Sequence, residues 1–92
     1  MARVQSIDLA GVEAFWNPGD HDPPHFHAKK AEHWHVKVHF MENRDRMIEV
    51  RRENKKLTGN ARRALCEAVE AAREALLEEW ERMHPEPERG LR

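Results

Sequence analysis

The chain of 92 residues has no tyrosine, a single cysteine and no long apolar run. Cys66 has no partner for an internal disulfide, which agrees with a reducing compartment, and its place among apolar residues predicts a small buried side chain. No apolar stretch approaches the roughly 20 residues of a membrane span. Residues 1–11 also lack the apolar core of a signal peptide. We therefore expect a cytoplasmic protein.

The composition is polar for so short a chain, with 39% hydrophobic and 36% charged residues. This length supports one small hydrophobic core, so we predict a single α+β domain over residues 1–84 and a flexible tail over residues 85–92. The net charge of −1 conceals a basic stretch at residues 51–63. Four of its side chains are candidates for phosphate contacts: Arg51, Arg52, Lys55 and Lys56. A solvated loop followed by a helix start is the alternative interpretation.

Histidines are concentrated in one segment, since six of the seven lie between His21 and His39. From residue 34 to residue 40 the even positions are apolar and the odd ones polar, and residues 25–29 alternate in the same way. Successive side chains of a strand point to opposite faces, so both segments are predicted to be half-buried strands with a histidine-rich outer face.

The two segments are predicted to pair as an antiparallel hairpin. Both apolar rows share one face only if the loop has an odd number of residues, and residues 30–32 are a candidate loop. This register places His27 opposite His35 and His25 opposite Lys37. The resulting patch, which also holds Lys29, contains groups that can bind metal or phosphate or move protons.

Further strands are predicted on both sides of this hairpin. Residues 4–9 and 12–16 flank Gly11 and look like a short hairpin. Beyond a turn at residues 41–45, Ile48 and Val50 match the parity of the preceding strand if Phe40 pairs with Arg46. The sequence thus predicts an antiparallel meander of four or five strands with one apolar face.

A long helix is predicted from Thr58, a plausible N-cap, to about residue 84, where Pro85 ends it. Its predicted core stripe consists of Leu65, Val69, Ala72, Leu76, Trp80 and Met83, flanked by Ala61, Ala68 and Ala75. Its predicted outer side carries Glu67, Glu70, Glu74, Glu78 and Glu81. At 1.5 Å per residue such a helix is roughly 40 Å long. Because this exceeds the width of a small sheet, we expect its second half to project, bend or pack in a homodimer.

The run DHDPPHFHA, followed by strands and a helix that ends in LLEEW, resembles a family of short bacterial proteins known as a domain of unknown function. The resemblance covers roughly residues 4–82 and rests on a DH-x-PPHFHA signature. It implies a toxin–antitoxin setting with a cognate partner protein, and in some members a role in transcriptional regulation. The signature positions here are Asp20, His21, Pro23, Pro24, His25, Phe26 and His27. His33, His35 and His39 lie outside the signature.

Metal binding is the first hypothesis for the histidine face. His25 and His27 are one residue apart, so on a strand both rings project from one face. His21 or Asp22 is a candidate third ligand, and His35 a fourth. Nitrogen and oxygen ligands without thiolate suit zinc, nickel, copper or iron. The alternative is a polar outer face on which histidines are merely tolerated.

Two other functions stay open. In the first, His25, His27 and His35 act as general acid and base in metal-free RNA cleavage, while Lys29 and Lys37 stabilise the developing charge. In the second, the chain is a non-catalytic module that contacts a protein or DNA. The tryptophans Trp16, Trp34 and Trp80 are predicted to be core residues in every case.

Overall fold

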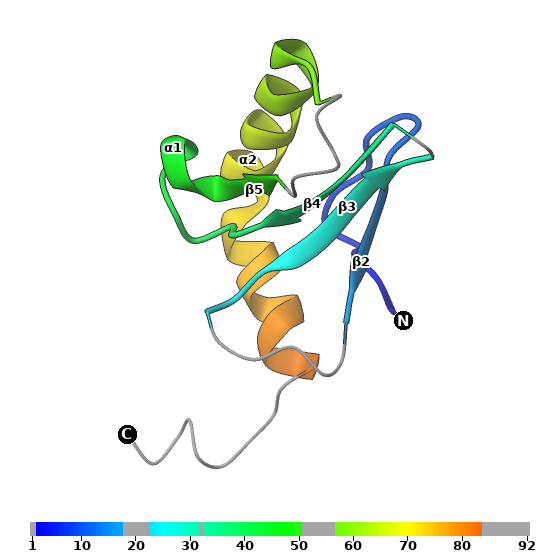
Figure 1. The fold of residues 1–92 in the computed structure, drawn as a ribbon. Helices are drawn as coiled ribbons and strands as arrows, with labels where there is room; N and C mark the ends of the chain where they lie inside the picture. The colour runs from blue at the N-terminus through cyan, green and yellow to red at the C-terminus, as the bar shows by residue number, and fades with distance from the viewer. Residues whose placement is uncertain (1, 18–22, 32, 51–56, 84–92) are drawn as a thin grey trace.

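The fold joins one antiparallel sheet to one long helix (Figure 1). The structure, a computed structural model, describes residues 2–17, 23–31, 33–50 and 57–83. Its elements in chain order are β1 (Ala2–Arg3), β2 (Glu13–Trp16), β3 (Phe26–Lys30), β4 (Trp34–Val38), α1 (Arg44–Met47), β5 (Ile48–Val50) and α2 (Gly59–Met83). The strands lie in the order β1-β2-β3-β4-β5, and α2 runs across one face of this sheet. The predicted α+β class and antiparallel meander are confirmed.

The apolar face of the sheet follows the alternation in the sequence. Phe26, Ala28, Val36 and Val38 are each at most 1% exposed, whereas the odd-numbered residues between them are partly exposed. Burying large apolar side chains against α2 removes them from water, which is the main favourable contribution to folding. The predicted core tryptophans are confirmed as well: Trp16, Trp34 and Trp80 are 2%, 3% and 1% exposed.

The register of the β3–β4 hairpin differs from the predicted one by two residues. His27 pairs with Lys37 and Lys29 with His35, so the predicted pairs of His27 with His35 and His25 with Lys37 were wrong. Lys30 still pairs within the ladder, and Ala31 takes a positive φ of 44° in the turn that follows. A shift of two residues keeps every side chain on its face, so the hydrophobic pattern alone could not distinguish the two registers.

The β4–β5 register is as predicted, with Val38 opposite Ile48 and Val36 opposite Val50. The predicted turn at residues 41–45 is longer than expected, because it leads into the short helix α1. The sheet's pairing continues past the end of β4, since the His39 amide donates to the Met47 carbonyl at 2.7 Å.

The predicted strand at residues 4–9 was wrong. Only Ala2 and Arg3 form a strand beside β2, and the Val4 amide adds one more bond to the Ala14 carbonyl. The turn at Gly11 is confirmed by its φ of 76°. The segment after Val4 leaves the sheet because it bonds to a helix side chain instead of to β2.

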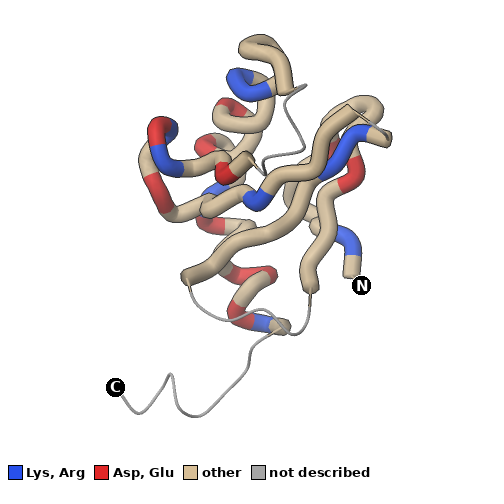
Figure 2. Tube along the Cα trace, viewed as in Figure 1, with Lys and Arg blue, Asp and Glu red and all other residues tan. Residues whose placement is uncertain are grey.

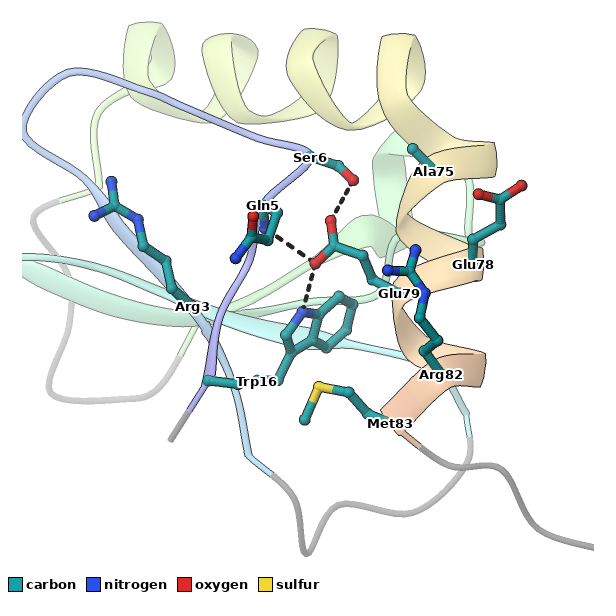
Figure 3. Close-up of a pocket in the computed structure, with 10 residues that line it drawn as sticks. Arg3, Gln5, Ser6, Trp16, Ala75, Glu78, Glu79, Arg82 and Met83 are labelled. Carbon is teal, nitrogen blue, oxygen red and sulfur yellow. Dashed lines mark hydrogen bonds between the residues drawn. The ribbon is translucent and has the colours of Figure 1, made fainter.

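That helix side chain is Glu79, which is 8% exposed. Its carboxylate accepts hydrogen bonds from the Gln5 amide at 3.0 Å, from Trp16 Nε1 at 2.9 Å and from the Ser6 hydroxyl (Figure 3). Burial raises the pKa of Glu79, but hydrogen bonds from Gln5, Ser6 and Trp16 together outweigh this and hold the pKa below its ordinary value. The carboxylate therefore links the N-terminal segment, the sheet and α2.

The helix begins and packs largely as predicted. Thr58 is confirmed as the N-cap, since its hydroxyl accepts from the Ala61 amide at 3.1 Å. The residues of α2 that are buried are Leu65, Cys66, Val69, Leu76, Glu79 and Trp80. Ala75, predicted to flank the stripe, is exposed instead. At Ala72 the backbone leaves helical geometry (φ −117°, ψ 16°), so α2 bends there, one of the three outcomes expected for so long a helix. The predicted glutamates of the outer side are all exposed.

Truncation of Leu76 tests how far the fold depends on the helix–sheet interface. Leu76 is fully buried, so Leu76→Ala should lower the free energy of unfolding by about 2–5 kcal/mol through lost burial and a residual cavity. Urea unfolding followed by tryptophan fluorescence measures this loss. Leu77→Ala is the matched control, because Leu77 is only partly buried. An equal loss in both variants would contradict the assigned orientation of the helix.

The Glu79 hydrogen bonds make a separate prediction. Because the pKa of Glu79 is lower in the folded chain, the ionised carboxylate stabilises the fold above about pH 4.5, and that stabilisation is lost as the pH falls through the folded-state pKa. Glu79→Leu leaves buried donors unsatisfied and should cost about 1–3 kcal/mol at neutral pH. Glu79→Gln should cost less and should show a smaller change in unfolding free energy between neutral and acidic pH. An unchanged pH dependence in Glu79→Gln would refute the role assigned to this carboxylate.

Candidate functional site

The candidate site lies on the face of the sheet opposite α2, which we call the outer face. Among the described residues no helix covers it. The strand registers place five side chains in one row across all five strands, in the order Arg3, Phe15, His27, Lys37 and Glu49. Lys and Arg outnumber Asp and Glu on the strands, whereas α2 carries residues of both signs with Glu in excess (Figure 2). The outer face therefore gathers cationic, aromatic and imidazole groups together with the Glu49 carboxylate.

His25 departs from the prediction that it faces solvent, because it is only 6% exposed. It precedes the first residue of β3, so strand alternation does not dictate its direction. Its Nδ1 lies 2.9 Å from the Pro23 carbonyl oxygen. A carbonyl can only accept, so Nδ1 carries the proton, and in the neutral ring Nε2 carries the lone pair. The ring also contacts Trp80 of α2, with centroids 5.9 Å apart, and so connects the core to the outer face.

Three further imidazoles adjoin His25 or one another. The centroids of His25 and His27 are 5.5 Å apart, those of His25 and His39 are 5.5 Å apart, and those of His27 and His35 are 5.7 Å apart. We call His25, His27, His35 and His39 the imidazole cluster. The predicted ligands His25, His27 and His35 are thus brought near each other, and His39 joins them from the end of β4. The predicted ligands His21 and Asp22 lie outside the described residues.

His39 is held by a carboxylate on the neighbouring strand. Its Nε2 lies 2.9 Å from Glu49 Oε1. This hydrogen bond lowers the pKa of Glu49, burial opposes the shift, and the nearby Lys37 cation reinforces it. Because the carboxylate accepts, Nε2 of His39 carries a proton and Nδ1 is the ring nitrogen with the lone pair when the ring is neutral.

Phe15 is a site residue that the sequence interpretation missed. Its ring stacks on His27, with centroids 5.3 Å apart and planes at 12°, and its centroid lies 5.9 Å from that of His35. The Lys29 ammonium lies 5.9 Å from the Phe15 ring. The signal was present in the sequence, because Phe15 stands between Ala14 and Trp16, whose parity is that of the core. Alternation therefore requires a large aromatic on the outer face.

A pocket of about 450 Å³ opens on this face. Its lining residues are Phe15, Asn17, His27, Lys29, His35, Val36, Lys37 and Glu49. The predicted phosphate contacts Lys29 and Lys37 both belong to it. The other predicted phosphate contacts, Arg51, Arg52, Lys55 and Lys56, lie outside the described residues.

A larger pocket of about 600 Å³ lies beside the C-terminal half of α2 and contains Glu79 (Figure 3). Arg3 and Arg82 also line it. Its buried carboxylate already accepts from three donors of the chain, so this pocket is explained by the structural role of Glu79. The imidazole cluster is the stronger candidate for chemistry.

Over residues 2–17, 23–31, 33–50 and 57–83, no group of three or more histidine, cysteine, aspartate or glutamate side chains is already arranged to hold a metal ion. A complete metal site therefore requires a shift of the described rings or ligands from outside the described ranges. Within the same ranges, no helix is both long enough and apolar enough to cross a membrane.

Comparison with known proteins gives one match. Searches of curated proteins and of solved structures find no match. A family model described as a domain of unknown function (DUF4160) matches residues 14–81, which include all of β2 except Glu13, all of β3 to β5 and nearly all of α2. This match covers most of the chain, so the protein belongs to the DUF4160 family.

Proposed function

We propose that the chain is a small cytoplasmic bacterial domain that binds a divalent transition metal at the imidazole cluster, through His25, His27 and His39. The toxin–antitoxin setting implied by the DHDPPHFHA signature is part of this proposal. One observation carries it: in both His25 and His39, one ring nitrogen donates to an oxygen of the chain, which fixes the tautomer and leaves the lone pair of the neutral ring on the other nitrogen.

This arrangement is typical of metal-ligating histidines. Such residues usually donate their second ring nitrogen to a backbone carbonyl or a carboxylate, which fixes the tautomer and makes the ligand nitrogen more basic. Pro23 supplies the carbonyl for His25, and Glu49 supplies the carboxylate for His39. The Pro23–Pro24 dipeptide stiffens the backbone just before His25, and the adjoining Trp80 restrains its ring.

The spacing of the rings agrees with shared coordination after a small adjustment. Metal–nitrogen bonds of roughly 2.0–2.1 Å to one tetrahedral ion place two imidazole centroids roughly 5 Å apart. The distances from His25 to His27 and from His25 to His39 are both 5.5 Å. Coordination also requires the rings to turn until their ligand nitrogens meet at one point, because the described side chains are not already arranged to hold a metal ion.

The remaining ligands would come from His21 or Asp22, which precede this segment in the chain, or from His35 beside His27. A set of nitrogen and oxygen ligands without thiolate suits zinc, nickel, copper or iron. Which of these metals is preferred depends on the geometry of the complete site.

Metal titration of protein purified without a histidine tag tests the proposal. Zn²⁺ binding followed by calorimetry should show one ion per chain, and Co²⁺ should give a visible absorption band that reports its ligands. His25→Asn can still donate to the Pro23 carbonyl, so it should keep the fold and lose the metal. Glu49→Gln removes the carboxylate and should weaken binding by roughly 10–100-fold.

His33→Asn is the matched control, because His33 is exposed in the hairpin turn. It should bind metal as the unmodified chain does. Urea unfolding of each variant separates loss of ligand from loss of fold. Absence of Co²⁺ absorption and of Zn²⁺ heat in the folded, unmodified chain would refute the proposal, as would equal losses in His33→Asn and His25→Asn.

A further inference from the structure

We propose that the outer face binds a single-stranded nucleic acid, with a base against Phe15 and phosphates on Lys37, Lys29 and Arg3. This inference does not depend on the metal proposal, since it uses the middle of the sheet, whereas the metal is assigned to the end near His25. The two proposals share His27 and Glu49, which belong both to the row and to the surroundings of the imidazole cluster.

The geometry of the row suits an extended ligand. Arg3, Phe15, His27, Lys37 and Glu49 are successive cross-strand neighbours. With about 4.8 Å between neighbouring strands, the row spans roughly 19 Å. A strand of nucleic acid laid across it would meet an aromatic ring and two cations in one line.

The aromatic group is accessible from more than one side. Phe15 is partly exposed and borders two pockets of the outer face, the one of about 450 Å³ already described and another of about 220 Å³. The smaller pocket is lined by Arg3, Glu13, Ala14, Phe15 and Lys29. Bases stack on exposed aromatic rings with little regard to sequence, because every base has a π-face. His27 already stacks on one side of the Phe15 ring, so a base would continue the stack on the other side of Phe15 or on the far side of His27.

The charges on the face favour a polyanion. Lys37 stands in the row between His27 and Glu49, and Arg3 lies at its other end. Lys29 is paired with Glu13 at 3.7 Å, but both side chains are well exposed, so this pair is weak and leaves Lys29 able to contact a phosphate. The outer face thus carries three cationic side chains and two carboxylates, those of Glu13 and Glu49. The Glu49 carboxylate already accepts a hydrogen bond from His39.

A single strand fits this surface better than a duplex. The face is a sheet with an aromatic ring at the edge of a pocket. Unpaired bases can reach that ring, whereas the bases of a duplex are stacked on each other. A duplex could still contact the lysines through its phosphates. Preference for a single strand is therefore the property that distinguishes recognition by Phe15 from charge attraction alone.

Fluorescence anisotropy of the full chain with a short labelled oligonucleotide tests the proposal. Single-stranded RNA, single-stranded DNA and a duplex of the same sequence are compared, with EDTA present so that the result is independent of metal. The chain should bind at least one single strand more tightly than the duplex. Phe15→Leu keeps an apolar side chain and should weaken binding about fivefold or more.

Lys37→Gln should weaken binding and reduce the slope of log affinity against log salt by about 0.7, the value for one phosphate contact on a single strand. Lys30→Gln is the matched control for Lys37→Gln. The Lys30 side chain lies beside Gly11 and lines a pocket together with Trp34 and with Ala61 of α2, on the side of the sheet away from the outer face. Lys30→Gln should leave affinity and slope unchanged. Circular dichroism checks that all variants are folded.

Three results would overturn the proposal: no binding to either single strand at low salt, duplex binding as tight as single-strand binding, or equal losses in Lys30→Gln and Lys37→Gln. Failure here with intact Zn²⁺ binding would leave the metal proposal standing. If the chain takes up no Zn²⁺ but binds the single-stranded oligonucleotide in EDTA, the nucleic-acid proposal is supported and the metal proposal is not.

Discussion

The packing of α2 on one face of the sheet through Trp16 is the contact on which the other features depend. The Trp16 ring lies 5.9 Å from Phe26, 5.9 Å from Phe40 and 6.0 Å from Trp80, measured between centroids. Its indole nitrogen donates to Glu79, so one side chain supplies both apolar contact and a buried polar bond between sheet and helix. Once α2 covers this face, the other face is left to polar and aromatic side chains.

His25 connects this core to the outer face. Its ring contacts Trp80 of the core as well as the imidazoles of His27 and His39. A substitution in the core beside Trp80 would therefore also move a ring of the candidate site. The Pro23 carbonyl and the Glu49 carboxylate hold two of the rings through one nitrogen each, so the cluster is organised by the fold before any ligand binds.

Some of the site followed from the sequence and some did not. Alternation predicted that His27, His35 and Lys37 share a face, because a strand has a period of two residues. It could not fix which residue lies opposite His27, because a register shifted by two has the same hydrophobic pattern. It also placed His25 in solvent, since the rule for strands was applied one residue before β3 begins.

By itself the sequence determined the α+β class, the face of each strand residue, the start of α2 at the Thr58 cap and the burial of the tryptophans. Each of these features depends on local spacing and on the transfer of apolar surface from water. The tertiary structure alone decided three features: the departure of residues 5 and 6 from the sheet, the burial of His25, and the neighbours of Phe15. Each depends on groups far apart in the chain, such as Glu79, which binds Gln5 across 74 positions. No periodicity in the sequence encodes such a contact, since its energy exists only after the layers have packed.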